Sequence, residues 1–183
     1  NVSPKNVYGI SKAEGENLLI KRISITNQLS ILRTSWLMSP YGKNFAVNMM
    51  KLLMSKDLVN VVYDQIGSPT TALTLSNAIW RLIKVNDKFS LENKTFPKIS
   101  HFADNGIASW YDVAVTLHEI GLQKGLIKNK VEIYPIKSIE YPTAAIRPTY
   151  SVLETQTTKK ILNIKGIHWR DALKETFKKD FKL

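Results

Sequence analysis

Hydrophobic and polar positions follow two different periods along the chain, which predicts a mixture of helices and strands. In residues Tyr8–Gln28, apolar side chains recur mostly every three or four positions, as they do on an α-helix with one apolar face. Residues Leu29–Leu37 then form a strand-like run that ends at Ser39-Pro40-Tyr41-Gly42. A helix that leads into a strand favours a layered α/β arrangement.

The remaining sequence continues this alternation. Helices are expected at Phe45–Lys56, Thr74–Val85, Ser109–Gly121, Gln156–Asn163 and Trp169–Phe181, and extended segments at Val59–Tyr63, Lys98–Ala103 and Val131–Pro135. Ser109 is a residue type that caps helix N-termini, so we expect it to be an N-cap. No segment repeats at a fixed period, and no linker rich in Pro, Gly or Ser divides the chain. We therefore expect residues 1–183 to form one α/β unit.

Composition excludes several classes of site and partner. The chain has 183 residues and no cysteine, which excludes a disulfide framework, a thiolate zinc site and a cysteine nucleophile. Its net charge is +11, but the basic residues are mostly spread along the sequence instead of clustered. A spread of this kind is typical of a lysine-rich solvated surface, and we expect no nucleic-acid partner.

The distribution of apolar residues gives no sign of a membrane segment. No run approaches the roughly 20 apolar residues that a spanning helix needs, and the first residues lack the charged-then-apolar layout of a signal peptide. We expect a chain that does not cross a membrane and that works in the cytoplasm. The first residue is Asn1, and residues 2–6 read as the continuation of a longer protein.

A tyrosine and a lysine near the N-terminus form a candidate acid–base pair. Tyr8 and Lys12 are four residues apart in the first predicted helix, which puts both side chains on one face. A neighbouring cation favours the phenolate form of a tyrosine and so makes it a usable proton donor or acceptor. Taken alone this spacing is common, and an aromatic residue beside a surface lysine is the ordinary interpretation.

Metal chemistry finds little support in the sequence. His101, His118 and His168 are far apart, and no His-Glu-x-x-His or paired-histidine spacing occurs. Glu14 and Glu16 are two residues apart, so a helix directs them differently. We predict no metal site.

Several longer motifs occur together in a fixed order. They are Tyr-Gly-x-Ser-Lys-x-x-Gly-Glu from residue 8, Leu-Arg-Thr-Ser-Trp-Leu from residue 32, Asp-Gln-Ile-Gly-Ser-Pro-Thr from residue 64, Ser-Trp-Tyr-Asp from residue 109 and Tyr-Pro-Thr-Ala-Ala-Ile-Arg-Pro from residue 141. This series resembles the dTDP-4-dehydrorhamnose reductase family of the extended short-chain dehydrogenases/reductases. The resemblance covers essentially the whole chain and implies a Rossmann-like α/β fold with a mixed α/β substrate-binding lobe.

The resemblance implies roles for three residues. Tyr8 would protonate the sugar oxygen while NADPH or NADH delivers a hydride to a C4 ketone, and Lys12 would hold the nicotinamide ribose beside it. Trp36 would pack against the deoxysugar, for which a flat indole with one N–H donor is suited; a buried core tryptophan is the alternative. The implied substrate is a nucleotide-activated 4-keto-6-deoxysugar of dTDP-L-rhamnose biosynthesis.

Other motif residues carry weaker expectations. Asn44 and the Gly67-Ser68-Pro69 loop could approach the nucleotide-sugar or be a helix cap and a structural turn. Arg147 could meet a diphosphate or form a structural ion pair. The aromatic residues at apparent helix starts, Trp110, Tyr111 and Trp169, are expected to be packing residues.

One expected part of such an enzyme is absent from this sequence. Its eight glycines never fall in the Gly-x-Gly-x-x-Gly spacing that cradles a dinucleotide diphosphate. We therefore expect residues 1–183 to be the C-terminal portion of such an enzyme, which carries the catalytic helix and the substrate-binding residues. Alone, this portion should be inactive. It should either self-associate, as a possible homo-oligomer, or depend on an N-terminal half. A related epimerase or dehydratase, or a non-catalytic regulatory subunit, remain alternatives.

Overall fold

The chain forms a mixed α/β structure, which confirms the expected fold class. The computed structural model describes residues 2–23, 29–92, 96–128, 130–145 and 147–177. Its elements in chain order are α1 (Val7–Ile23), β1 (Ile31–Arg33), β2 (Leu37–Met38), α2 (Phe45–Ser55), β3 (Leu58–Val62), β4 (Ile66–Gly67), β5 (Thr70–Thr71), α3 (Ala72–Leu91), β6 (Ile99–His101), β7 (Ala108–Ser109), α4 (Trp110–Gln123), β8 (Glu132–Ile136), the 3₁₀ turn η1 (Ser138–Glu140), β9 (Tyr150–Ser151), α5 (Gln156–Leu162) and α6 (Trp169–Thr176). None of the described helices is both long enough and apolar enough to span a membrane.

The strands pair in four small groups. Three pairs are parallel, namely β1 with β6, β2 with β5, and β3 with β8. In the fourth group β4 pairs antiparallel with β7 and parallel with β9. Parallel strands cannot be joined by a tight turn, so these pairs bring together segments that are distant in sequence and separated by helices.

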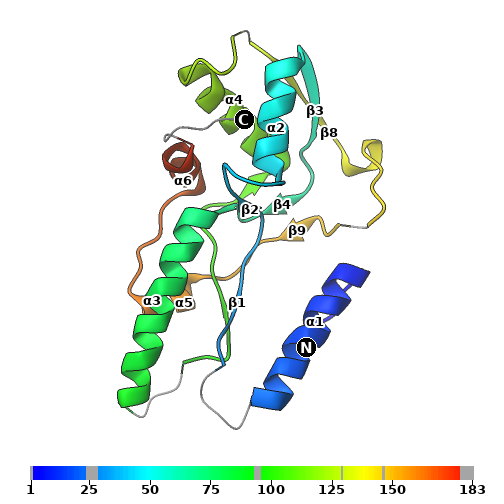
Figure 1. Cartoon of the computed structure of the whole chain (residues 1–183). Helices are drawn as coiled ribbons and strands as arrows, with labels where there is room; N and C mark the ends of the chain where they lie inside the picture. Colours follow the sequence, from blue (N-terminus) through cyan, green and yellow to red (C-terminus); the bar gives the residue numbers. More distant parts are fainter. Residues whose placement is uncertain (1, 24–28, 93–95, 129, 146, 178–183) are drawn as a thin grey trace.

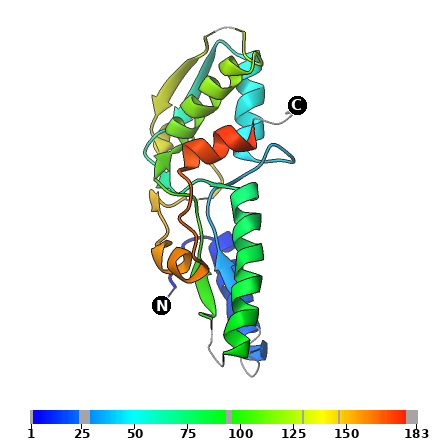
Figure 2. The ribbon, with the colours of Figure 1, turned by 90° about the vertical axis from the view of Figure 1, so that its left-hand side faces the viewer.

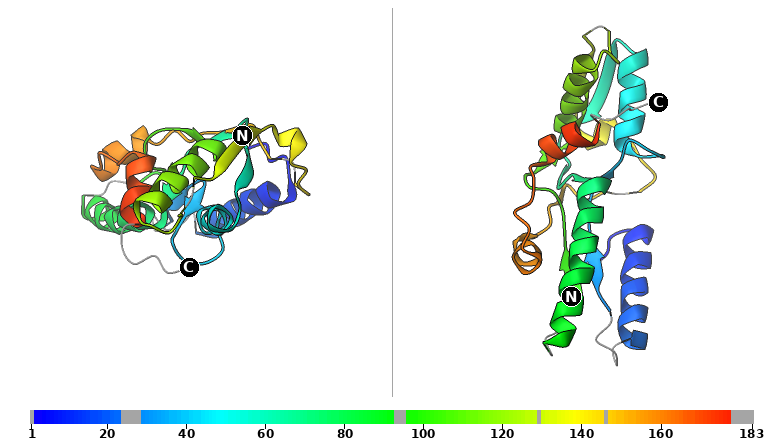
Figure 3. Two further views of the ribbon diagram at one scale, coloured as in Figure 1. Left: turned by 90° about the horizontal axis from the view of Figure 1, so that it is seen from above. Right: turned by 60° about the vertical axis from the view of Figure 1, so that its left-hand side comes forward.

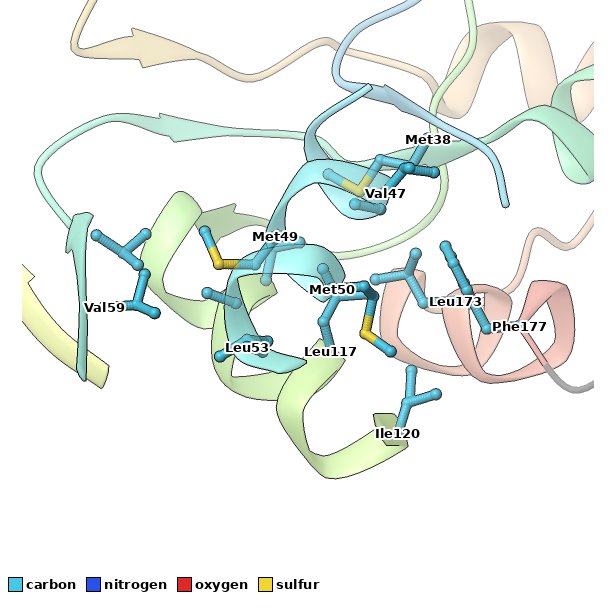
Figure 4. Close-up of a cluster of buried hydrophobic side chains, with 14 of the residues drawn as sticks. Met38, Val47, Met49, Met50, Leu53, Val59, Leu117, Ile120, Leu173 and Phe177 are labelled. Atoms are coloured by element: carbon cyan, nitrogen blue, oxygen red, sulfur yellow. The ribbon is translucent and has the colours of Figure 1, made fainter. Parts of the chain in front are cut away.

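The elements form two halves, an upper lobe and a lower lobe as seen in Figure 1. The upper lobe contains α2, β3, α4, β8 and α6, whose apolar side chains make the larger core (Figure 4). Met50, Leu53 and Leu117 are almost fully buried there, between α2 and α4, and Leu173 of α6 closes the cluster. Each such side chain that is fully buried stabilises this lobe by about 1.5–3 kcal/mol.

The lower lobe contains α1, β1, α3, β6 and α5. Its smaller core joins Ala78 and Leu82 of α3 to Phe102, which follows β6, and to Leu162 of α5. Strand β1 lies between α1 and α3 (Figures 1 and 3). Figure 2 shows α3 along one side of this lobe, with α6 of the upper lobe near its upper end.

The structure differs from the sequence expectations mainly at element ends. Helix α1 ends at Ile23, and residues 24–28 of the predicted helix lie outside the described residues. Helix α3 runs from Ala72 to Leu91, longer than expected, because Thr71 caps its start and helix-compatible residues follow its apolar stripe. The last helix ends at Thr176, and residues 178–181 lie outside the described part.

The predicted strand Leu29–Leu37 is wrong as one continuous element. It divides into β1 and β2, because Trp36 adopts a left-handed backbone conformation with φ of 44°. A residue in that conformation cannot continue an extended strand. The break turns β2 away to pair with β5 instead of β6.

Candidate functional site

The first helix presents Tyr8 and Lys12 together at the surface. Asn6 begins it, because its side-chain oxygen accepts a hydrogen bond from the Gly9 N–H at 2.8 Å. Lys12 Nζ lies 5.4 Å from the centroid of the Tyr8 ring, a cation–π geometry, so the i, i+4 spacing has the predicted effect. Tyr8 is 72% exposed. A phenol hydroxyl and an ammonium are therefore both accessible on one face, where they can donate hydrogen bonds to a bound molecule.

An ion pair joins helix α1 to β1 within the lower lobe. Both carboxylate oxygens of Glu16 accept hydrogen bonds from the Arg33 guanidinium, with Arg33 Nε 2.8 Å from Oε1. These hydrogen bonds hold the pKa of Glu16 below its ordinary value. No residue of α1 is buried, and Val7, Ile10, Leu18 and Leu19 are exposed. The apolar face of α1 is thus largely uncovered.

Trp36 lies in a rigid aromatic stack. Its ring is parallel to that of Trp110 within 4°, with ring centroids 3.6 Å apart. Phe45 packs against the same Trp110 ring at a centroid distance of 4.5 Å. The backbone is fixed as well, since the Trp36 carbonyl accepts a hydrogen bond from the Thr70 N–H at 3.2 Å.

Gly67 provides the space that this stack occupies. A Cβ atom at residue 67 would lie 2.4 Å from Cε2 of Trp36 and 2.6 Å from its Nε1, closer than atoms can approach. Gly67 is therefore required by the indole that lies over it. This explains the glycine of the Gly67-Ser68-Pro69 loop as a packing requirement of Trp36.

A chain of hydrogen bonds continues from the stack to the 3₁₀ turn η1. Trp110 Nε1 donates to Gln65 Oε1 at 3.1 Å, and Gln65 Nε2 donates to Ser138 Oγ at 3.0 Å. Asp64 then accepts hydrogen bonds from the backbone N–H and hydroxyl of Ser138. Trp110 thus has its ring fixed at both its face and its N–H.

The structure places the weaker sequence candidates as follows. Asn44 is the N-cap of α2 and accepts from the N–H groups of Ala46 and Val47, so the structural interpretation of this residue is confirmed. Arg147 is exposed. Trp169 is buried in the upper core, as expected for a packing residue.

Trp110 has more than the simple packing role that its position at a helix start indicated. It packs against the upper core, but it also carries Trp36 and the hydrogen bond to Gln65. No local pattern pairs residues 36, 65 and 110, because the contacts depend on the fold. The described contacts of Trp36 include neither Tyr8 nor Lys12, so the convergence of all three on one substrate stays a prediction. Within the described ranges, no three metal-ligating side chains cluster.

Comparison with known proteins establishes the class first. The chain superposes on solved structures of Rossmann-like extended short-chain reductases and epimerases. It matches a dTDP-4-dehydrorhamnose reductase from Bacillus anthracis in complex with NADP with a TM-score of 0.79 and 30% identity, over 97% of this chain and 57% of that one. A UDP-galactose 4-epimerase at 17% identity and a TM-score of 0.70 shares the fold.

The sequence comparisons then define the family. The model of the RmlD substrate binding domain matches residues 1–181, and the chain belongs to this family. A dTDP-4-dehydrorhamnose reductase from Aggregatibacter actinomycetemcomitans is 34% identical over 94% of this chain and 57% of its own length. The spore coat polysaccharide biosynthesis protein SpsK of Bacillus subtilis is 37% identical over 95% of this chain and 54% of its length. The chain therefore spans a little over half the length of these relatives.

Proposed function

We propose that this chain is the catalytic-helix and substrate-binding portion of an NAD(P)H-dependent reductase of a nucleotide-activated 4-keto-6-deoxysugar. The observation that carries the proposal is the exposed Tyr8–Lys12 pair on α1 in a member of the RmlD substrate-binding family. Relatives named dTDP-4-dehydrorhamnose reductase support the substrate class. The cytoplasmic location expected from the sequence suits such a biosynthetic enzyme.

The proposed roles follow from what each side chain can do. The Tyr8 hydroxyl donates its proton to the carbonyl oxygen of the sugar, and the Lys12 ammonium stabilises the phenolate that remains. Trp36 is half-buried and its ring is held between Trp110 and Gly67, so the part of the indole that stays exposed offers a sugar an apolar contact in a fixed position. Protonation by a positioned side chain contributes roughly 10²–10⁴-fold to a rate.

The residues present suit one part of a nicotinamide cofactor. When bound, the reduced nicotinamide supplies a hydride to the carbonyl carbon. Lys12 has an exposed ammonium whose three N–H groups suit the hydroxyls of a ribose, beside the Tyr8 hydroxyl. The diphosphate is assigned to residues outside these 183, because the sequence lacks the required glycine spacing. A solved relative that holds NADP supports this class of cofactor, and the choice between NADPH and NADH stays open.

The test is a reductase assay on the full-length protein that contains this segment. With dTDP-4-dehydrorhamnose as substrate we expect net oxidation of NADPH, and Tyr8→Phe and Lys12→Met should each reduce kcat by at least a hundredfold. Tyr41→Phe and Lys21→Met are matched controls, since both residues are exposed and lie outside the proposed site. The 183-residue chain alone should give no turnover and weak or no NADPH binding.

The outcomes distinguish the alternatives. An epimerase or dehydratase would convert its sugar nucleotide without net oxidation of the cofactor, and a regulatory subunit would show no turnover with any of these substrates. Wild-type activity in the Tyr8→Phe enzyme would refute the assigned proton donor. Micromolar NADPH binding by the 183-residue chain would refute the proposed division of the site between two parts.

A further inference from the structure

Asp64 and Gln65 join β3 to β4, and each lies opposite a residue that follows another strand. The register of β3 with β8 continues to Asp64 and Ser138, and the register of β4 with β7 continues to Gln65 and Trp110. The side chains of both pairs are hydrogen-bonded to each other. These two neighbouring residues therefore connect the turn η1 to the first residue of α4.

Donor and acceptor types fix the direction of every hydrogen bond in this chain. The indole N–H of Trp110 can only donate, so Gln65 must present Oε1 to it and turn Nε2 toward Ser138 Oγ, 3.0 Å away. Ser138 Oγ accepts there, and its own proton goes to Asp64 Oδ1 at 2.5 Å. The Asp64 carboxylate, which only accepts, ends the chain and also accepts from the Ser138 backbone N–H at 2.9 Å.

The hydrogen bond to Gln65 selects the rotation of the Trp110 ring. The Trp110 backbone is fixed between β7 and the capping box at the start of α4, but an aromatic ring can still turn about its Cβ–Cγ bond. Turning would take the indole N–H away from Gln65 and leave a half-buried carboxamide oxygen without its donor, which is unfavourable. The chain thus holds the ring at the angle at which it lies parallel to Trp36.

The Trp36 ring takes its position from its neighbours by packing. Trp110 lies on its face, with ring centroids 3.6 Å apart, and Gly67 lies against the indole on the side of Cε2 and Nε1. A change in the angle of the Trp110 ring is therefore passed on to Trp36. Gln65 can in this way act on Trp36 through Trp110.

We propose that Gln65 is a positioning residue for the sugar-binding surface of Trp36, and that Ser138 and Asp64 hold the Gln65 carboxamide in the orientation that this role requires. This inference rests on the proposed function, in which Trp36 contacts the sugar. Such a contact is made equally before and during the reaction, so misplacing Trp36 weakens substrate binding and leaves the chemical step nearly unchanged. The Asp-Gln pair of the motif that starts at residue 64 thereby has a role of its own, beside that of Gly67.

The test is Gln65→Met in the full-length protein that contains this segment, because methionine keeps the length of the side chain and removes both hydrogen bonds. We expect the KM for dTDP-4-dehydrorhamnose to rise about three- to tenfold, with kcat changed by less than about twofold. The NMR signal of the Trp36 indole N–H, assigned with Trp36→Phe and shifted upfield by the Trp110 ring, should move toward that of an exposed indole. Gln123→Met, at an exposed position near the other end of α4, is the matched control.

A wild-type KM or a wild-type Trp36 signal in Gln65→Met would overturn the proposal. If Gln65→Met does not fold, Ser138→Ala removes only the hydroxyl that orients Gln65 and must change both measurements in the same direction. A full-length protein without reductase activity would refute the proposed function, and the Trp36 signal would then decide this inference alone. An unchanged KM in Trp36→Ala would likewise refute the sugar contact and not the positioning by Gln65.

A rescue experiment tests the proton directions. Gln65→Glu alone should be impaired, because two carboxylates would compete for the single hydroxyl proton of Ser138 and repel each other. Adding Asp64→Asn supplies an N–H to Ser138 Oγ, so that the Ser138 hydroxyl can donate to the new carboxylate and the chain runs in reverse. The double variant should recover the wild-type KM and Trp36 signal. Wild-type behaviour of Gln65→Glu alone, or no recovery in the double variant, would overturn the proposal.

Discussion

Replacing Gly67 by alanine should dismantle the Trp36 stack. The added Cβ would lie 2.4 Å from Cε2, 2.6 Å from Nε1 and 2.8 Å from Cζ2 of the indole, so the whole ring must move. Overpacking of this kind costs about 1–3 kcal/mol. Loss of the stack on Trp110 adds about 0.5–1.5 kcal/mol, so we expect Gly67→Ala to lower the free energy of unfolding by about 2–4 kcal/mol in all.

Urea unfolding, followed by near-ultraviolet circular dichroism, measures both effects. The parallel indoles should give a strong aromatic signal in the wild type that is reduced in Gly67→Ala, together with a lower midpoint. Gly15→Ala is the matched control, because a Cβ there meets no atom within 4 Å and lies in the exposed helix α1. This substitution should leave the aromatic signal unchanged and increase the stability of helix α1 by about 0.5–1 kcal/mol.

A double-mutant cycle shows whether the indole causes the loss. With Trp36→Leu already in place, the Gly67→Ala substitution should cost much less, giving a coupling energy of about 1–3 kcal/mol. Equal costs in both backgrounds would mean that the alanine acts on something other than Trp36. A Gly67→Ala protein with wild-type midpoint and aromatic signal would refute the packing argument altogether.

Three further predictions concern polar contacts. Glu16→Gln should weaken the attachment of α1 by about 1 kcal/mol, measured as faster amide exchange in α1. Because the folded pKa of Glu16 is lowered, this contribution is complete above the unfolded-state pKa and is lost as pH falls through the folded pKa, so wild type and variant should converge in acid. Ser109→Ala should lower the free energy of unfolding by about 1 kcal/mol, because the capping box with Asp112 is lost; unchanged urea midpoints would contradict this. Burial raises the pKa of Asp104, so its ionisation destabilises the fold as pH rises from the unfolded-state to the folded-state pKa; Asp104→Asn should remove that pH dependence, and an equal slope in both proteins would contradict it.

The sequence predicted the helices better than the strands. Helix positions followed from apolar periodicity and caps such as Ser109, which act locally. Most observed strands have only two or three residues, too few for an alternating pattern to be recognised. The break at Trp36 escaped prediction because no local residue pattern marks it. The contacts that accompany the left-handed backbone, with Gly67, Thr70 and Trp110, come from segments distant in the sequence.

The candidate sites divide in the same way. Tyr8 and Lys12 are four residues apart on one helix, so their juxtaposition could be predicted from spacing alone. Gln65, Trp110 and Ser138 are far apart in the sequence. Their hydrogen bonds result from the pairing of β4 with β7 and of β3 with β8, for which the sequence has no local signal.

The attachment of α1 through Glu16 and Arg33 gives the lower lobe a dependence on ionic strength. Tyr8 precedes Glu16 by about 12 Å along the helix axis, at 1.5 Å per residue, so a small rotation about the ion pair becomes a larger displacement of the phenol. Dissolved ions screen charges over about 8 Å at physiological concentration, which weakens a partly exposed pair. Salt should therefore change where the Tyr8 hydroxyl lies relative to Trp36, while the apolar core of the upper lobe, built on Met50, Leu53 and Leu117, has no charges for salt to screen.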